Sequence, residues 1–226
     1  MGSSGNFKHD LFNQFARVGK VLSNGNRLEL LEFLAQGERS VEELANLTGL
    51  SIANTSQHLQ QLRQAGLALT RKEGLKVYYR LSGDDVIDLL TALRAVAERH
   101  LADVERLITT YLTVKDDLEP IPREELLARA RDELITVIDV RPPQEYAAGH
   151  VPGAINIPLA DLETHLNDFD PAQEIVAYCR GPHCVLAFDA VSTLRSKGMK
   201  ARRLEDGYPE WKRAGLPIEK SDKSEA

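Results

Sequence analysis

The sequence predicts two domains: a mainly α helix-turn-helix domain with a β-hairpin wing, followed by an α/β domain with a central parallel sheet. Apolar residues recur at helical spacing through most of residues 6–114, interrupted by two strand-like runs around a basic segment. After a charged stretch with two prolines, strand-like and helical segments alternate. That alternation is typical of a parallel sheet with helices on both faces.

We expect the first domain over residues 6–114, a linker over 115–121, the second domain over 122–218 and a charged tail over 219–226. Residues 1–5 resemble the remnant of an expression tag. The sequence contains no signal peptide and no apolar run of the roughly 20 residues that a membrane span needs. The predicted location is therefore the cytoplasm, without membrane contact, where thiols are mostly reduced.

Charge is spread unevenly along the chain. Residues 1–115 carry 14 basic and 13 acidic side chains, whereas residues 116–226 carry 14 and 21, so the net charge of −6 resides in the second half. Residues 51–82 hold five basic side chains against a single acidic one. An acidic protein can still bind DNA through a local basic face of this kind.

Two short helices with a tight turn between them are predicted in the first domain. Ser40 and Glu43 have the spacing of a capping box for a helix that ends at Gly49. Ser51 can cap a second helix, which stops at Gly66. Strand-like runs over 67–70 and 77–81, around a basic loop at 71–76, predict the wing. Together these elements predict a winged helix-turn-helix.

Polar side chains lie off the apolar stripe of the second short helix and could read base edges or hold phosphates in a major groove. They are Asn54, Ser56, Gln57, His58, Gln60, Gln61 and Arg63. On the hairpin, Arg71, Lys72 and Lys76 suit phosphates or a minor groove. The alternative is an ordinary solvated helix face, but the order of turn, polar helix and basic wing favours DNA binding.

A long helix is predicted after the wing. Ser82 and Asp85 have the spacing of a second capping box, and an apolar stripe runs from Val86 to Tyr111. This stripe corresponds to a single helix of about seven turns. Such a helix outruns a small domain, so we expect part of it to pack on another subunit. The alternative is that it packs only within its own chain.

Residues 10–112 resemble the ArsR/SmtB-type winged-helix repressors, chiefly through the run from Asn54 to Leu62 and through Ala65-Gly66-Leu67. The resemblance implies a homodimer built from the first and last helices that binds a palindromic double-stranded operator. The metal sites of the family do not carry over. The helix over 41–50 has no cysteine, and Glu98, His100 and Asp103 lack a second histidine beside them. We therefore expect no metal and no cofactor.

Both cysteines lie in one short segment, from Tyr178 to Val185. Cys179 follows a buried strand, and a helix begins after Cys184. A cysteine in such a loop faces backbone N–H groups and the positive end of a helix, which favour a thiolate and hold an anion beside it. The predicted active-site loop continues with Arg180, Gly181, Pro182, His183, Cys184 and Val185, in which Arg180 and His183 could add positive charge near an anionic donor and Gly181 permits a tight path.

Residues 121–218 resemble a single rhodanese domain, through residues 137–141, Glu145-Tyr146, 149–158, the Cys179 loop and 206–211. The resemblance implies that Cys179 is a nucleophile. It would take sulfane sulfur from a donor such as thiosulfate or polysulfide, hold it as a persulfide and pass it to a thiol or to cyanide. Asp139 and Arg141 are expected to order the loops around the site, and His150 to belong to a structural turn.

The spacing around Cys179 separates two chemistries. A loop that grips a tetrahedral oxyanion for phosphatase or arsenate-reductase chemistry needs an arginine six residues after the cysteine, where this chain has Val185. Sulfur transfer is therefore the better interpretation. Cys184 has two interpretations: a small apolar residue at the start of a helix, or a resolving thiol that forms a disulfide with Cys179.

The main hypothesis is a DNA-binding transcriptional regulator whose rhodanese-like domain senses or transfers reactive sulfur through a Cys179 persulfide. Any sulfurtransferase activity of the rhodanese type would then be secondary to transcription regulation. The alternative is a thiosulfate sulfurtransferase whose winged helix only localises the enzyme. A third hypothesis is a catalytically idle domain that serves protein interaction.

Overall fold

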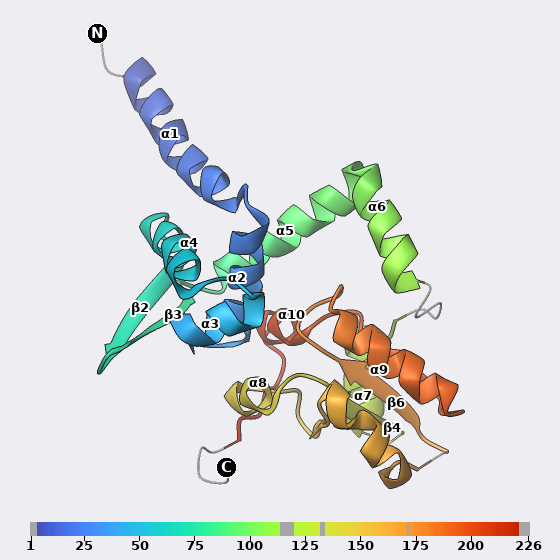
Figure 1. The fold of residues 1–226 in the computed structure, drawn as a ribbon. Helices are drawn as coiled ribbons and strands as arrows, with labels where there is room; N and C mark the ends of the chain where they lie inside the picture. The colour runs from blue at the N-terminus through green and yellow to red at the C-terminus, as the bar shows by residue number, and fades with distance from the viewer. Residues whose placement is uncertain (1–3, 114–119, 132–133, 171, 222–226) are drawn as a thin grey trace. The chain divides into compact units, whose positions relative to one another are not determined.

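The computed structural model describes residues 4–113, 120–131, 134–170 and 172–221 (Figure 1). The chain divides into two compact units, residues 1–90 and 91–226. Most of the expected linker, the first three residues of the tag-like segment and the end of the charged tail lie outside the described residues. The domain bounds expected from the sequence stay a prediction.

The first unit contains the predicted winged helix-turn-helix. Its elements are α1 (Ser4–Leu22), α2 (Gly25–Gln36), β1 (Arg39–Ser40), α3 (Val41–Thr48), α4 (Ile52–Gln64), β2 (Ala68–Glu73) and β3 (Lys76–Leu81). The strands form an antiparallel sheet in the order β1-β3-β2. Leucines of α2, α3 and α4 fill the core, among them the fully buried Leu30, Leu44 and Leu59.

Local capping explains the helix-turn-helix. The Glu43 N–H donates to Ser40 Oγ at 3.2 Å, and the Ser40 N–H donates to Glu43 Oε2 at 2.7 Å, which confirms the capping box. Gly49, with φ of 67°, ends α3 in the left-handed conformation. Ser51 then caps α4 by accepting from the Asn54 N–H at 3.3 Å.

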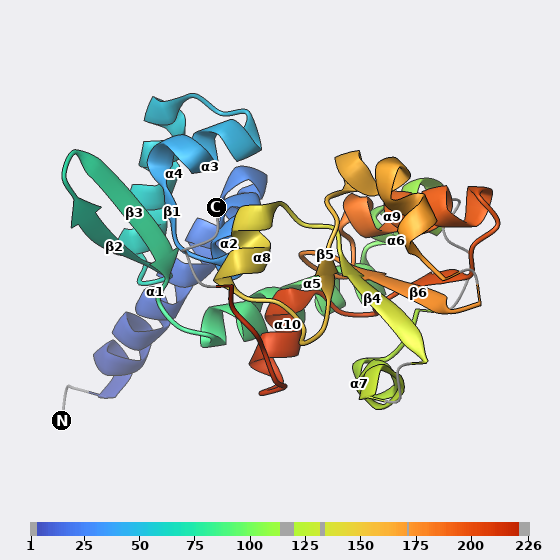
Figure 2. The same ribbon diagram turned by 90° about the horizontal axis from the view of Figure 1, so that it is seen from below.

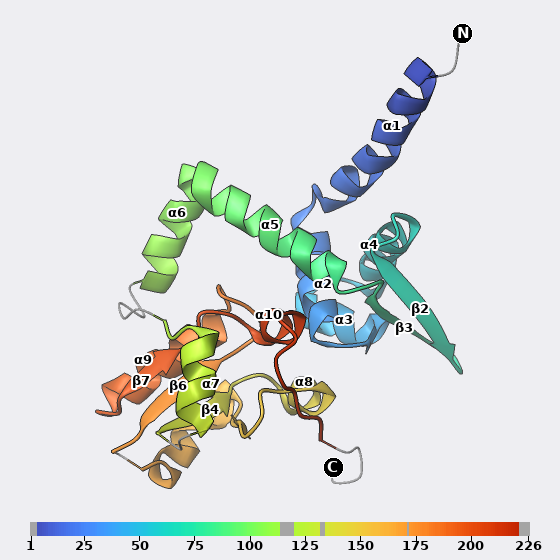
Figure 3. The ribbon, with the colours of Figure 1, turned by 180° about the vertical axis from the view of Figure 1, so that it is seen from behind.

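The wing is longer than its strand-like runs suggested. Pairing of β2 with β3 extends out to Glu73 opposite Lys76, so only Gly74 and Leu75 form the turn (Figure 3). Gly74 has φ of 58°, as a two-residue hairpin turn requires. The expected loop over 71–76 is therefore wrong, and Arg71, Lys72 and Lys76 extend from paired strands.

The single long helix expected after the wing is also wrong. The structure has α5 (Asp85–His100), a break at Leu101, α6 (Ala102–Ile108) and a π-helical turn over Thr109–Thr113. Charge fits the break: Arg99 and His100 lie in the last turn of α5, and Asp103 lies in the first turn of α6. The Ser82–Asp85 capping box is wrong too, because Asp85 is already the first helical residue.

The second unit continues with the predicted α/β domain. Its elements are α7 (Arg123–Arg131), β4 (Ile135–Asp139), α8 (Pro143–Ala148), β5 (Ile155–Asn156), the 3-10 helix η2 (Leu159–Asp168), β6 (Glu174–Tyr178), α9 (Val185–Ser196), β7 (Ala201–Arg203) and α10 (Tyr208–Arg213). The sheet has the order β5-β4-β6-β7, with every pair parallel. In the described part of the chain, no helix is both long and apolar enough to cross a membrane.

Both faces of this sheet are covered, since α7 and α9 lie on opposite sides of it (Figure 2). Side chains of β6 alternate between the faces. Ile175 and Ala177 pack in the cluster that contains α9, whereas Val176 and Tyr178 pack in the cluster that contains Trp211. Cys179 therefore leaves the sheet at the carboxyl end of a central strand, which is where ligands bind in open α/β sheets.

Candidate functional site

The exposed face of α4 carries most of the predicted DNA-reading side chains. Asn54, Gln57, Gln60 and Arg63 are exposed, while Ser56 is half-buried and accepts a hydrogen bond from Gln60 Nε2 at 3.4 Å. Exposed amides and a guanidinium on one helix are suited to base edges and phosphates.

Two of the predicted readers face inward instead. Gln61 is half-buried, and its Oε1 accepts a hydrogen bond from Arg27 Nη1 of α2 at 2.7 Å. His58 is half-buried, and no described residue hydrogen-bonds its buried Nδ1 atom. Burial, and secondarily the charge of Arg27, lowers the pKa of His58, so the ring favours its neutral form. These two side chains are better placed to hold α4 on the domain than to reach a base.

On the wing, Arg71 is tied to two carboxylates. Its Nη2 lies 2.7 Å from Glu38 Oε2, and its Nη1 lies 2.5 Å from Glu73 Oε2. The guanidinium also stacks 4.7 Å from the centre of the Tyr78 ring. The hydrogen bonds that Arg71 donates, to Glu38 first and to Glu73 second, raise the pKa of Arg71. Lys72 and Lys76 are exposed on the same hairpin.

A cavity of about 370 Å³ lies between α4 and the wing. Gln60 and Arg63 line it from α4, and Thr70, Arg71 and Lys72 line it from β2. Three cations therefore surround one cavity, which matches the basic face that the sequence predicted between residues 51 and 82.

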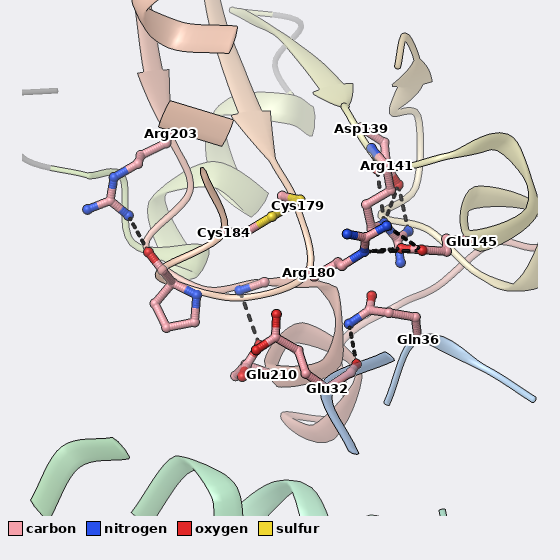
Figure 4. Close-up of a disulfide and its surroundings, with 12 residues drawn as sticks. Glu32, Gln36, Asp139, Arg141, Glu145, Cys179, Arg180, Cys184, Arg203 and Glu210 are labelled. Carbon is pink, nitrogen blue, oxygen red and sulfur yellow. Dashed lines mark hydrogen bonds and ion pairs between the residues drawn. A yellow bond between two sulfur atoms is a disulfide. The ribbon is translucent and has the colours of Figure 1, made fainter. Parts of the chain in front are cut away.

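In the second unit, the structure brings the two cysteines together. Cys179 follows β6 and Cys184 precedes α9, and their sulfur atoms form a disulfide with a Cα–Cα separation of 6.1 Å (Figure 4). This separation lies inside the range that disulfides ordinarily span. Cys179 is buried, whereas Cys184 is half-buried. The sequence left this pairing open.

The Cys179 loop is held from several sides. The Cys184 N–H donates to the Gly181 carbonyl at 3.1 Å, closing a turn within the loop. Arg203 Nη1 of β7 donates to the Pro182 carbonyl at 3.4 Å (Figure 4). Gly207 packs so closely under the loop that a Cβ there would collide with backbone atoms of Arg180 and Gly181. The path of the loop is therefore set by residues more than 20 positions away.

The two cations expected near an anionic donor both face carboxylates. Arg180 Nη2 lies 2.8 Å from Oε1 of Glu145, a fully buried residue of α8 (Figure 4). His183 Nε2 lies 3.5 Å from Glu98 Oε1 within the same unit. Val185, at the first position of α9, is about half exposed. Neither cation is therefore directed solely at the sulfur atoms.

Asp139 and Arg141 form a fully buried ion pair, with Arg141 Nη2 2.6 Å from Asp139 Oδ2. Burial lowers the pKa of Arg141, but hydrogen bonds to Asp139 and the nearby negative charge, chiefly that of Asp139, together outweigh burial and raise the pKa. Arg141 also donates to the Gly149 carbonyl at 2.8 Å. This geometry supports the predicted role in ordering loops.

Tyr178 extends this network toward the cysteine. Its hydroxyl donates to Asp139 Oδ2 at 2.6 Å and accepts from the Val151 N–H at 3.0 Å. Burial first, and the charge of Asp139 second, raises the pKa of Tyr178, which keeps the hydroxyl protonated. Tyr178 is the last residue of β6, so its two hydrogen bonds fix the end of the strand directly before Cys179.

His150 lies in the predicted structural turn. Its ring stacks on Tyr146 with centroids 3.6 Å apart, and its Nδ1 lies 2.9 Å from the Tyr146 carbonyl oxygen. Its backbone exchanges hydrogen bonds with Glu219 at 2.9 and 3.0 Å. His150 is buried and belongs to the framework rather than to the cysteine loop.

Three groups at the site have no role predicted from the sequence: Glu145, the Tyr178 hydroxyl and Gly207. Glu145 belongs to one of the motifs that resemble a rhodanese domain, which was a signal for this residue. A buried carboxylate needs a cation beside it, but the sequence could not identify that cation because Arg180 lies 35 residues away. The contact of Gly207 with the loop leaves no local signal in the sequence.

Two family models match different parts of the chain. Residues 122–214 match a family model described as a rhodanese-like domain. Residues 24–69 match one described as a bacterial regulatory protein of the arsR family.

One relative is similar over nearly the whole chain. The HTH-type transcriptional regulator Rv0324 of Mycobacterium tuberculosis is 47% identical over 219 residues, which covers 97% of this chain and 96% of that protein.

Two solved structures resemble parts of it. The first is the homodimeric winged helix-turn-helix DNA-binding domain of Mb0332 from Mycobacterium bovis, 45% identical, with a TM-score of 0.42; the match covers 46% of this chain and 95% of the solved one. The second is a rhodanese-related protein from Thermoplasma volcanium, 25% identical, with a TM-score of 0.41; the match covers 45% of this chain and 98% of the solved one.

Proposed function

The chain belongs to the ArsR family of bacterial transcriptional regulators and carries a rhodanese-like domain, and we propose that it couples operator binding to sulfur held as a persulfide on Cys179. The observation that carries the proposal is the position of Cys179. It lies at the carboxyl end of β6, in a loop that leads into the N-terminus of α9. This setting favours a thiolate and an anionic sulfur donor beside it.

The proposed sulfur transfer needs little besides that loop. The Cys179 thiolate attacks the outer sulfur of thiosulfate, the sulfur–sulfur bond of the donor breaks, and sulfite leaves with the electron pair. The product is a Cys179 persulfide. Polysulfide would react in the same way, with a shorter polysulfide as the leaving group. Burial of Cys179 supports shielding of this product from other thiols in solution.

On the DNA side, the basic cavity and the exposed face of α4 support binding of a double-stranded operator. A homodimer is supported by exposed apolar side chains on two helices. These are Phe7, Leu11, Phe12 and Phe15 on α1 and Leu89, Leu93 and Val96 on α5. Burying both sets against a second copy would remove a large apolar area from water.

The test measures DNA affinity with and without a sulfur donor. Reduced full-length protein would first select a duplex from a random pool. Its affinity for that duplex would then be compared before and after treatment with thiosulfate or polysulfide, for native protein and Cys179→Ser. We expect a change of at least about tenfold, or 1.4 kcal/mol, in the native protein and none in the variant.

An equal response in both proteins would overturn the sensing proposal. Rapid sulfur transfer from thiosulfate to cyanide, together with unchanged DNA affinity, would favour the alternative function. In that case the protein is an enzyme that the winged helix only localises.

A further inference from the structure

Cys184 lies where it can react with whatever Cys179 carries. The two sulfur atoms are bonded in the structure, and the Cα atoms are 6.1 Å apart, so direct contact requires no rearrangement of the loop. The hydrogen bond from the Cys184 N–H to the Gly181 carbonyl, at 3.1 Å, folds the chain back to make this approach. Both cysteines of the chain are used in this pair.

The surroundings assign different roles to the two sulfurs. Cys184 is the N-cap residue of the 12-residue helix α9, and its side chain makes no capping hydrogen bond. The positive end of a helix favours a thiolate at this position. Cys184 is half-buried, whereas Cys179 is buried against the sheet. Cys184 is therefore suited to attack, and Cys179 to be attacked.

The loop is also anchored at two positions between the cysteines. Arg180 is bound to Glu145, with Nη2 and Oε1 2.8 Å apart. Pro182 is bound through its carbonyl to Arg203, whose guanidinium stacks 4.3 Å from the centre of the Phe188 ring. Anchored neighbours keep the two sulfurs close in the reduced protein, which raises their effective concentration for reaction with each other.

We propose that Cys184 is a resolving thiol that converts a Cys179 persulfide into a Cys179–Cys184 disulfide and releases hydrogen sulfide. The step rests on the proposed function, because it needs the persulfide. The Cys184 thiolate attacks Cys179 Sγ, a bond forms between these two sulfurs, and the bond from Cys179 Sγ to the outer sulfur breaks. The electron pair leaves with the outer sulfur as hydrosulfide ion.

The step is balanced in atoms and electrons. The sulfane sulfur is reduced by two electrons to sulfide, and the two cysteine sulfurs supply those electrons as they become a disulfide. A second dithiol would be needed to reduce the disulfide and reset the site. The chain would then reduce sulfane sulfur as well as carry it, and its lasting oxidised form would be the disulfide rather than the persulfide.

Thiosulfate separates the two steps, because loading releases sulfite and resolution releases sulfide. Reduced full-length protein would be mixed with thiosulfate, or with polysulfide in a second series, and followed by intact mass. In the thiosulfate series, released sulfite and sulfide would also be measured. We expect native protein to release one sulfite and one sulfide per chain and to lose the mass of two hydrogens. Cys184→Ser should release sulfite only, gain the mass of one sulfur and hold it at least about tenfold longer.

Native protein that keeps the added sulfur and releases no sulfide would overturn the resolving role and leave the persulfide proposal standing. Native protein that releases neither sulfite nor sulfide, together with Cys184→Ser that gains no sulfur from either donor, would overturn the persulfide proposal itself. Cys184→Ala serves as a second variant, and thermal unfolding of each variant shows that it is folded. Cys179→Ser should neither gain sulfur nor release sulfide.

Discussion

Arg180, the residue that follows Cys179, donates hydrogen bonds from Nε and Nη2 to the fully buried carboxylate of Glu145, at distances from 2.8 to 3.1 Å. The pair joins α8 to the cysteine loop across 35 positions of sequence. Arg180 is itself largely buried, with 13% of its side chain exposed. The guanidinium that was expected near an anionic donor thus anchors the loop to α8.

Replacing Glu145 with Gln should destabilise the second unit by about 3 kcal/mol, because it removes the buried negative charge that faces the largely buried guanidinium of Arg180. Urea unfolding of the reduced protein at neutral pH would measure the loss. Asp103→Asn is the matched control, since it removes an ion pair with Arg106 whose side chains are 73% and 82% exposed. We expect that control to change stability by less than about 0.5 kcal/mol. Equal effects in the two variants would contradict the anchoring role.

Gly207 packs against the backbone of the same loop. A methyl group there would collide with the backbone at Arg180 and Gly181, which cannot swing aside as a long side chain would. Gly207→Ala should therefore cost about 1–3 kcal/mol of stability. It should also shift the equilibrium between the Cys179–Cys184 disulfide and its dithiol about tenfold toward the dithiol, because the loop must move.

A glutathione redox buffer with thiol trapping would measure that equilibrium. Gly25→Ala is the control, since nothing lies within 4 Å of the Cβ it would add. An unchanged disulfide equilibrium in Gly207→Ala would show that the loop does not depend on this contact.

Arg71 of the wing forms ion pairs with Glu38 and Glu73, so we expect these carboxylates to compete with DNA phosphate for it. Changing both to Gln should strengthen binding to duplex DNA severalfold and steepen the logarithmic salt dependence by about 1, as one more phosphate is neutralised. Fluorescence anisotropy across a salt series would measure both quantities. The same two changes in an Arg71→Ala background report the effect of lost negative charge alone. An equal gain in both backgrounds would contradict a role for released Arg71.

The sequence predicted the structural features that depend on residues close together in the chain. The Ser40–Glu43 capping box joins groups three positions apart, and burial of β6 on both faces follows from its apolar run. The position of Cys179 between strand and helix followed in the same way. The break at Leu101 was hidden because the apolar stripe continues through it in helical phase. Charge in the flanking turns was the available signal.

What the sequence could not reveal depends on distant partners. The distance between Cys179 and Cys184 is set partly by Arg203 and Gly207, which follow the loop by about 20 residues or more and reach it only after β7 has joined the sheet. The inward turn of Gln61 likewise depends on Arg27 of another helix. Patterns along a chain can identify which residues form a site. They identify less readily which of those side chains form hydrogen bonds or ion pairs with distant residues.

Glu210 gives the second unit a pH dependence whose sign can be stated. Burial raises the pKa of Glu210, and the charge of Arg94, 3.0 Å away, only partly opposes this. As pH rises above the unfolded value of 4.5, the unfolded chain has released this proton while the folded chain retains it. Folding then takes up a proton, so the stability contributed by the protonated form is lost as pH rises through the folded pKa.

Glu210→Gln removes that titration and keeps an oxygen to accept the Gly207 N–H, which donates to Glu210 at 3.2 Å. We expect its free energy of unfolding to decline less than that of native protein from about pH 4.5 to pH 7. Urea unfolding at several pH values would measure both slopes. Glu205→Gln, a neighbouring exposed carboxylate, is the control and should leave the native slope unchanged. A steeper decline in Glu210→Gln would mean that the ion pair with Arg94 outweighs burial.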